Sequence, residues 1–215
     1  MDERSTGLVL RIRPLTETSL IVHWLTPEFG RLATVAKGAR RPKSSFRGKI
    51  DLFFRADFSF ARSRRSQLHT LREVSLLDSL PGLRRDLVLL NQMSYATTLI
   101  EQTTETDTPV PEIYHLMVGF ANHVANHRPQ IVPMLAFELK LLHALGQEPN
   151  LKERKLSQTT ANLIPTLTDS SWDDLAGLTV EKRELRQIYQ FLNGFMLLHL
   201  GKIPKGRKIA FTQAS

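Results

Sequence analysis

The 215-residue chain contains no cysteine. Disulfide bonds, zinc ribbons, thiolate clusters and cysteine nucleophiles are therefore excluded, and the absence fits a reducing compartment. Long apolar runs are also absent, because no uninterrupted stretch reaches the roughly 18 to 20 residues that a membrane helix requires. Met1 is followed by Asp2, Glu3 and Arg4 instead of an apolar region, so we expect no secretory signal. These absences predict a soluble cytoplasmic protein that makes no contact with membranes.

Positive charge is abundant but unevenly placed. The net charge of the chain is +8. Residues 1–82 carry 15 lysines and arginines against 8 aspartates and glutamates, whereas residues 83–215 carry 14 against 13. A basic module joined to a neutral one indicates a dedicated surface for a polyanion, and nucleic acid is the commonest such partner.

Five short segments near the N-terminus have the pattern of β-strands, namely residues 7–13, 19–25, 31–36, 52–61 and 68–77. The first alternates Leu8, Leu10 and Ile12 with Val9, Arg11 and Arg13. The fourth has the clearest alternation, and we expect its apolar face to be buried, with Phe54, Ala56, Phe58 and Phe60. Five strands in a segment of this length match a five-stranded oligonucleotide-binding (OB) barrel, although other small barrels share that size.

After Gly82 the spacing of apolar residues becomes helical. We expect helices over residues 83–103, 110–126, 131–145 and 180–200, and a short helix capped by Ser170 or Ser171. The helix before Gly146 is apolar nearly all round, which is typical of a central helix. Residues 202–208 form a basic tail that we expect on the surface. The sequence thus predicts an α+β protein, with a five-stranded OB-type β-barrel in residues 1–80 followed by an α-helical domain in residues 81–215.

Residues 37–49 are the strongest candidate for a binding site, because they hold six cations and no anion between two expected strands. Cations in such a loop repel one another, and binding to phosphates releases condensed counterions. We assign the core phosphate contacts to Lys37, Arg40, Arg41, Lys43, Arg47 and Lys49. Weaker candidates are Arg11, Arg13 and Arg31, with Arg64 and Arg65 extending the same field, and Phe46 as a face for base stacking. The alternative is an ordinary solvated loop.

No catalytic constellation is found. His115, His123 and His127 are spaced eight and four residues apart, which can align them on a helix, but the glutamate of a zinc-protease motif is missing. Asp173 and Asp174 are adjacent and would point apart on a helix. The chain also lacks a Walker loop, a dinucleotide-binding GxGxxG and a GxSxG elbow. We therefore expect a protein that is not an enzyme and has no metal or other cofactor.

Several motifs, in order, resemble the bacterial RecO family of recombination mediators in DNA repair. The most specific is the run Ala-Lys-Gly-Ala-Arg-Arg-Pro-Lys-Ser at residues 36–44, preceded by Gly-Leu-Val-Leu-Arg at 7–11 and Glu-Thr-Ser-Leu-Ile at 17–21. Residues 136–142 and 199–208 resemble later parts of the family. Many family members carry a four-cysteine zinc module after the first of these. Here we expect a cysteine-free remnant around residues 147–179, to which metal binding cannot be carried over.

The resemblance implies a mechanism and a set of partners. Proteins of this family bind single- and double-stranded DNA and anneal complementary strands coated by single-stranded-DNA-binding protein (SSB). Together with RecR they help to load RecA, so that the contact with RecA is indirect. The acidic, apolar C-terminal tail of SSB docks on the helical domain, for which Arg128 and Lys140 are candidate contacts. A DNA-binding mediator of this kind would be associated with the nucleoid.

Three alternatives remain open from the residues alone. The first is an RNA-binding OB protein, because phosphate contacts do not distinguish RNA from DNA. The second is a metal-dependent hydrolase that uses the histidine row or Asp173. The third is an adaptor whose helical domain joins partners, with no annealing activity and an incidental basic face.

Overall fold

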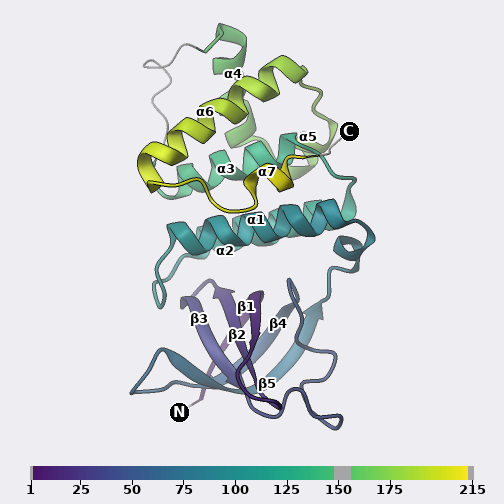
Figure 1. Cartoon of the computed structure of the whole chain (residues 1–215), viewed down its shortest axis with the longest axis vertical. Helices are drawn as coiled ribbons and strands as arrows, with labels where there is room; N and C mark the ends of the chain where they lie inside the picture. Colours follow the sequence, from purple (N-terminus) through teal and green to yellow (C-terminus); the bar gives the residue numbers. More distant parts are fainter. Residues whose placement is uncertain (1, 148–155, 213–215) are drawn as a thin grey trace. The chain divides into compact units, whose positions relative to one another are not determined.

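Five strands close into a barrel in the computed structural model of the chain, which describes residues 2–147 and 156–212 (Figure 1). The strands are β1 (Asp2–Pro14), β2 (Leu20–Thr26), β3 (Gly30–Ala36), β4 (Arg55–Ala61) and β5 (Leu68–Asp78). Their order around the barrel is β1-β2-β3-β5-β4. The β3–β5 pair is parallel and the other pairs are antiparallel. This arrangement, followed by helices, confirms the predicted α+β fold with an OB-type barrel.

Aromatic and β-branched side chains fill the barrel. Trp24 and Phe58 stack with their ring centroids 4.2 Å apart, and the Trp24 Nε1 donates a hydrogen bond of 2.9 Å to Thr34 Oγ1. Ala56, Phe58 and Phe60 are buried as the alternation predicted. Phe54 precedes β4 and only packs against the core. The interior is therefore a packed core that leaves binding to the outer surface and the loops.

A β-bulge changes the alternation predicted for β1. The register with β2 shifts between Val9 and Arg11, so that Leu10 has no paired residue on β2. Val9 belongs to the barrel core and Ile12 packs against it, although the sequence pattern placed these two residues on opposite faces. The bulge thus turns both Arg11 and Arg13 away from the interior.

The chain forms two compact units. The first consists of Met1–Leu80 with Thr104–Val118, and the second of Pro81–Thr103 with Gly119–Ser215. The predicted domains differ from these units in the segment Thr104–Val118, which groups with the barrel. The helical elements are η1 (Pro81–Arg85), α1 (Leu87–Thr103), α2 (Pro111–Asn126), α3 (Val132–Ala144), α4 (Gln158–Asp169), α5 (Trp172–Gly177), α6 (Lys182–Leu200) and α7 (Arg207–Ala210).

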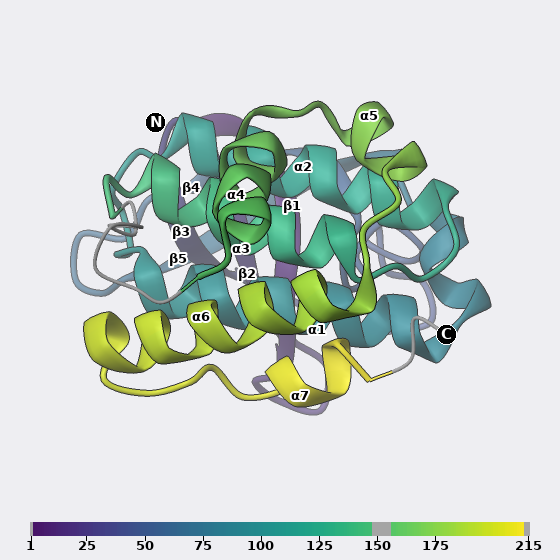
Figure 2. The same cartoon turned by 90° about the horizontal axis from the view of Figure 1, so that it is seen from above.

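Helix α3 is the centre of the second unit, as its apolar sequence predicted. Ten of its residues are buried, and α4, α5 and α6 pack against it (Figure 2). Gly146 follows the helix with a φ of +66°, which is typical of a residue just beyond a helix C-terminus. Ser171 caps α5, because its side chain accepts a hydrogen bond from the Asp174 backbone N–H and the Asp174 carboxylate accepts one in return.

The basic tail does not lie wholly on the surface. Arg207 is 1% exposed and donates two hydrogen bonds of 2.7 Å to the carboxylate of Glu138, which is fully buried. Its third donor group bonds Asn193, and its guanidinium carbon lies 3.9 Å from the ring centroid of Tyr189. The prediction of a surface tail is therefore wrong for Arg207. A guanidinium can be buried when it is paired and hydrogen-bonded, and the Glu138 carboxylate provides that pairing.

Candidate nucleic-acid interface

The basic loop, residues 37–49, is a succession of hydrogen-bonded turns. The backbone N–H groups of Arg41, Ser44 and Arg47 donate to the carbonyl oxygens of Gly38, Arg41 and Ser44 at 3.0, 3.1 and 3.2 Å. Gly38 has a φ of +69°, which favours glycine at this turn. The loop therefore has a defined backbone, which the sequence did not predict.

Phe46 anchors the basic loop and is not a stacking surface. Its ring is only 8% exposed and belongs to the barrel core, where Ala39 and Ile50 from either side of it also pack. The earlier assignment of Phe46 to base stacking is thus corrected, because an aromatic ring in an otherwise polar loop is drawn into the nearest apolar core.

All six cations of the basic loop are exposed: Lys37, Arg40, Arg41, Lys43, Arg47 and Lys49. Arg40 donates to the Thr16 carbonyl and Arg47 to the Pro42 carbonyl, each at 3.3 Å. Within residues 2–147 and 156–212, none of the six forms an ion pair with a carboxylate. The loop is therefore a concentrated positive surface whose charge is not neutralised by any carboxylate in the described part of the chain.

The remaining candidates separate into two groups. Arg13 lies on β1 opposite Ile21, which in turn pairs with Val35, and the basic loop begins two residues after Val35. Arg13 and the start of the loop therefore share one end of the barrel, and Arg11 lies two residues further along the same outer face. Arg31 is different, because its guanidinium donates to the side chain and the carbonyl of Thr104 at 2.8 and 2.6 Å. These bonds give Arg31 a structural contact, and its assignment to phosphate binding stays a prediction.

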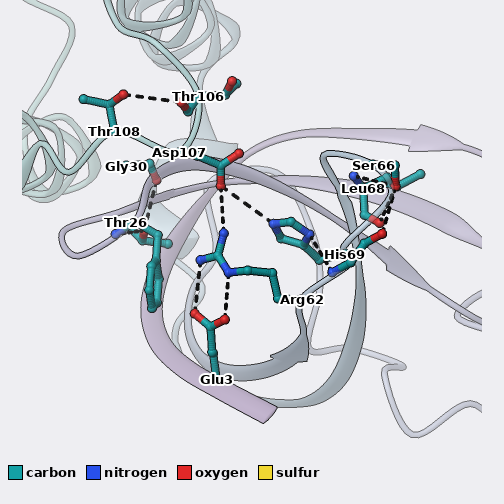
Figure 3. A network of polar contacts seen from close by, with 12 residues as sticks. Glu3, Thr26, Gly30, Arg62, Ser66, Leu68, His69, Thr106, Asp107 and Thr108 are labelled. Carbon is teal, nitrogen blue, oxygen red and sulfur yellow. Dashed lines mark hydrogen bonds and ion pairs between the residues drawn. The ribbon is translucent and has the colours of Figure 1, made fainter. Parts of the chain in front are cut away.

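A polar network holds the segment after α1 on the barrel (Figure 3). Arg62 donates to both oxygens of Glu3 at 2.7 and 3.1 Å, and to Asp107 Oδ1 at 3.3 Å. Hydrogen bonding to Arg62 lowers the pKa of Glu3, and the same bond raises the pKa of Arg62. Buried His69 lies with its Nε2 atom 3.7 Å from the same Asp107 oxygen. The charge of Arg62 is therefore already compensated inside the first unit.

The second unit contains an apolar pocket of about 870 Å³ with cations around it. Its apolar lining includes Ile131, Val132, Leu178, Val180, Leu185 and Phe211, and its cations are Arg128, Lys182, Arg186 and Lys208. The sequence identified Arg128 but missed the other three, because they come from separate segments and carry no local motif. Lys140 is not part of this pocket, since its ammonium donates to the carbonyl oxygens of Thr168 and Ser170.

The three histidines do not come together as a metal site. His123 and His127 stack with ring centroids 4.3 Å apart, and His115 is exposed elsewhere on α2. Burial, and then the neighbouring His127, lowers the pKa of His123 to about 4. Within the described residues, no group of three or more His, Asp or Glu side chains is placed to hold a metal ion.

The four-cysteine zinc module that the sequence resemblance implies has no thiolate donors here. The chain has no cysteine, so its residues do not fit a thiolate zinc site. Residues 148–155 of the expected remnant lie outside the described residues, and the helices α4 and α5 fall within the rest of it. No helix in the part of the chain that the structure describes is long and apolar enough to cross a membrane.

The fold and the basic loop define an OB-type barrel protein with a helical extension. Two family models match the sequence in consecutive segments: the N-terminal region of recombination protein O matches residues 1–80, and the C-terminal region matches residues 84–154. The chain therefore belongs to the recombination protein O (RecO) family.

Similar proteins carry the name DNA repair protein RecO. One from Listeria monocytogenes is 28% identical over 170 residues, which is 79% of this chain and 66% of the relative. One from Exiguobacterium sibiricum is 32% identical over 152 residues, or 70% and 60% of the two chains. One from Bacillus pumilus is 29% identical over 150 residues, or 70% and 58%. The matched part of this chain thus spans less than two thirds of the length of these relatives.

Proposed function

We propose that this chain binds DNA through the basic loop and acts as a non-enzymatic recombination mediator that anneals complementary strands. The observation that supports this most directly is the set of six exposed cations on one loop, none of which pairs with a carboxylate in the described residues. Each phosphate that binds there releases counterions, so that the affinity should fall steeply with salt.

Annealing requires no bond chemistry. Two complementary strands repel each other through their phosphates, and a cationic surface that neutralises both lowers this repulsion. The bases must stay free to pair. The lack of a stacking ring in the basic loop is consistent with this, since Phe46 is buried in the barrel. Double-stranded DNA would bind the same surface through the same phosphate contacts.

The pocket of the second unit is our candidate site for the C-terminal tail of SSB. An acidic, apolar peptide needs an apolar floor and positive charge at the rim. The pocket offers both, with Ile131 and Phe211 in its lining and with Arg128, Lys182 and Lys208 among its cations. We also propose cooperation with RecR, and through it the loading of RecA, from the resemblance to the family alone, and we assign no surface to it.

The DNA-binding proposal is tested by removing three loop cations together, in the variant Arg40→Ala/Arg41→Ala/Lys43→Ala. We expect weaker binding of single-stranded DNA and a salt slope that is flatter by about 2, since each lost contact to a single strand removes about 0.7. The thermal stability should stay unchanged, because exposed loop charges contribute little to folding.

A matched control removes three exposed cations elsewhere, in Arg72→Ala/Arg183→Ala/Lys202→Ala. It changes the net charge equally but should leave the affinity near that of the unmodified chain. Equal losses in both variants would mean that only the total charge matters. An unchanged affinity in the loop variant would remove the basic loop from the proposal, and equal competition by RNA would remove the preference for DNA.

A further inference from the structure

Two rows of outward residues cross β1, β2 and β3 beside the basic loop. One row pairs Arg13 with Ile21 and Ile21 with Val35, and the next pairs Arg11 with His23 and His23 with Ala33. The alternate residues of β2 and β3, such as Trp24 and Leu32, fill the barrel, so these rows lie on its outer face. In OB barrels this face and its flanking loops are the usual place for oligonucleotides.

The outer face of β1, β2 and β3 carries cations and no carboxylate in either row. The face formed by β1, β4 and β5 is mixed. Its groove of about 760 Å³ is lined by three cations, Arg4, Arg72 and Lys49 of the basic loop, and by three carboxylates, Glu28, Asp57 and Glu73. A polyanion is therefore favoured on the first of the two faces and opposed by the carboxylates on the second.

A second group of cations lies at the other side of this face, in the β4–β5 turn, residues 62–67. Leu68, just after the turn, pairs with Ala33, whereas the basic loop starts beyond Ala36. The two groups are thus separated by at least about 10 Å of strand. Arg64 and Arg65 are exposed, and neither has an ion-pair or hydrogen-bond partner for its side chain within the described residues.

The β4–β5 turn has an ordered backbone (Figure 3). The Ser66 hydroxyl accepts a hydrogen bond from the Leu68 N–H, and the Ser63 N–H donates to His69 Nδ1, both at 3.3 Å. Arg62 is held by Glu3 and Asp107, so its charge is compensated. The turn therefore presents two arginines, and not three, to an external anion.

Within the described residues, the two outer rows contain no Phe, Tyr or Trp side chain. Trp24 and Phe58 stack inside the barrel, and Phe46 and Phe60 are buried with them. The only ring in the two rows is the imidazole of His23. Proteins that hold single strands by their bases use exposed aromatic side chains. This face offers contacts to phosphates instead.

We propose that one DNA strand crosses the outer face of β2 and β3 from the basic loop to Arg64 and Arg65, held by its phosphates with its bases turned outward. The inference rests on the proposed function, because it extends the DNA-binding surface that starts at the basic loop. A strand held in this way is ready to pair, since its bases are not occupied by the protein. We refer to this path, which spans at least about 10 Å between the two groups of cations, as the track.

The test combines a variant with a modified strand. Arg64→Ala/Arg65→Ala in the full chain should weaken binding of a 15-nucleotide single strand severalfold and flatten the salt slope by about 1.4, which corresponds to two lost contacts. The control Arg183→Ala/Lys202→Ala, which also removes two exposed cations, should do neither. A 15-nucleotide strand without bases should bind within about threefold of the normal strand, because each stacked base would be worth at least about fivefold.

Two results would overturn the track. One is an unchanged affinity and salt slope in Arg64→Ala/Arg65→Ala. The other is a loss of more than tenfold with the strand that lacks bases, which would show that bases are held. If Arg40→Ala/Arg41→Ala/Lys43→Ala still weakens binding in the same assay, the proposed function survives and only the track fails. If neither variant weakens binding, both proposals fail together.

Discussion

Replacing Glu138 by glutamine removes the counter-charge of a guanidinium that is 1% exposed. Arg207 donates to both carboxylate oxygens of Glu138 at 2.7 Å, and the Tyr95 hydroxyl donates to one of them. Although burial acts to lower the pKa of Arg207, the charge and hydrogen bonds of Glu138 raise it. Glutamine keeps the shape of the side chain but leaves the positive charge buried without an anion.

Breaking a buried ion pair from one side costs about 3 to 5 kcal/mol. A domain of this size has a free energy of unfolding of about 5 to 15 kcal/mol, so the loss is large. Arg207→Met should cost a similar amount, because it leaves the carboxylate of Glu138 unpaired. In the double variant Glu138→Gln/Arg207→Met, the loss of unfolding free energy should be well below the sum of the losses in the two single variants, because neither charge is then buried without its partner.

Urea unfolding followed by circular dichroism at 222 nm measures these differences through the helices. The control is Glu181→Gln, the same chemical change at an exposed position whose side chain makes no capping hydrogen bond. It should stay within about 0.5 kcal/mol of the unmodified chain. A cost below about 1 kcal/mol for Glu138→Gln, or strict additivity in the double variant, would refute the reasoning.

Three further predictions concern stability. The pKa of His123 is lowered to about 4 in the folded chain, so the unfolded chain binds a proton first as the pH falls. The free energy of unfolding should therefore drop by about 2 kcal/mol from pH 8 to pH 5 through this group. This drop should be absent in His123→Phe. Gly30→Ala places a Cβ 1.8 Å from the Thr108 carbonyl oxygen at a φ of +64°, and should cost more than about 2 kcal/mol in urea unfolding, whereas Gly48→Ala, with open space at +72°, should cost only about 1 kcal/mol. Ser171→Ala removes the cap of α5 and should lower the melting temperature, at a cost of about 1 kcal/mol.

Patterns within a few residues predicted much of the fold. The alternation of Ala56, Phe58 and Phe60 placed β4 correctly, and the apolar sequence of α3 identified the central helix. The bulge in β1 could not be predicted, because it depends on the register with β2. The alternation therefore holds for Ile12, which packs against the core, and fails for Val9, which is buried in it.

In the candidate site, too, features that depend on neighbouring residues could be predicted, whereas those that depend on residues far apart in sequence could not. The six cations of the basic loop are neighbours in sequence, so their number and exposure follow from composition. Arg31 bonds Thr104, which is 73 residues away, and Arg207 bonds Glu138, which is 69 residues away. The local sequence around Arg31 and Arg207 does not distinguish them from arginines that are exposed to solvent. Only the three-dimensional pairing separates the cations used for structure from those that can bind phosphate.

Strand annealing tests the central claim most directly. Complementary labelled oligonucleotides, pre-coated with SSB, are mixed with and without the protein across a salt series. We predict an acceleration that weakens with salt, is lost in Arg40→Ala/Arg41→Ala/Lys43→Ala and is kept in Arg72→Ala/Arg183→Ala/Lys202→Ala. An absence of acceleration by a protein that still binds DNA tightly would contradict the mediator function and leave a DNA-binding adaptor.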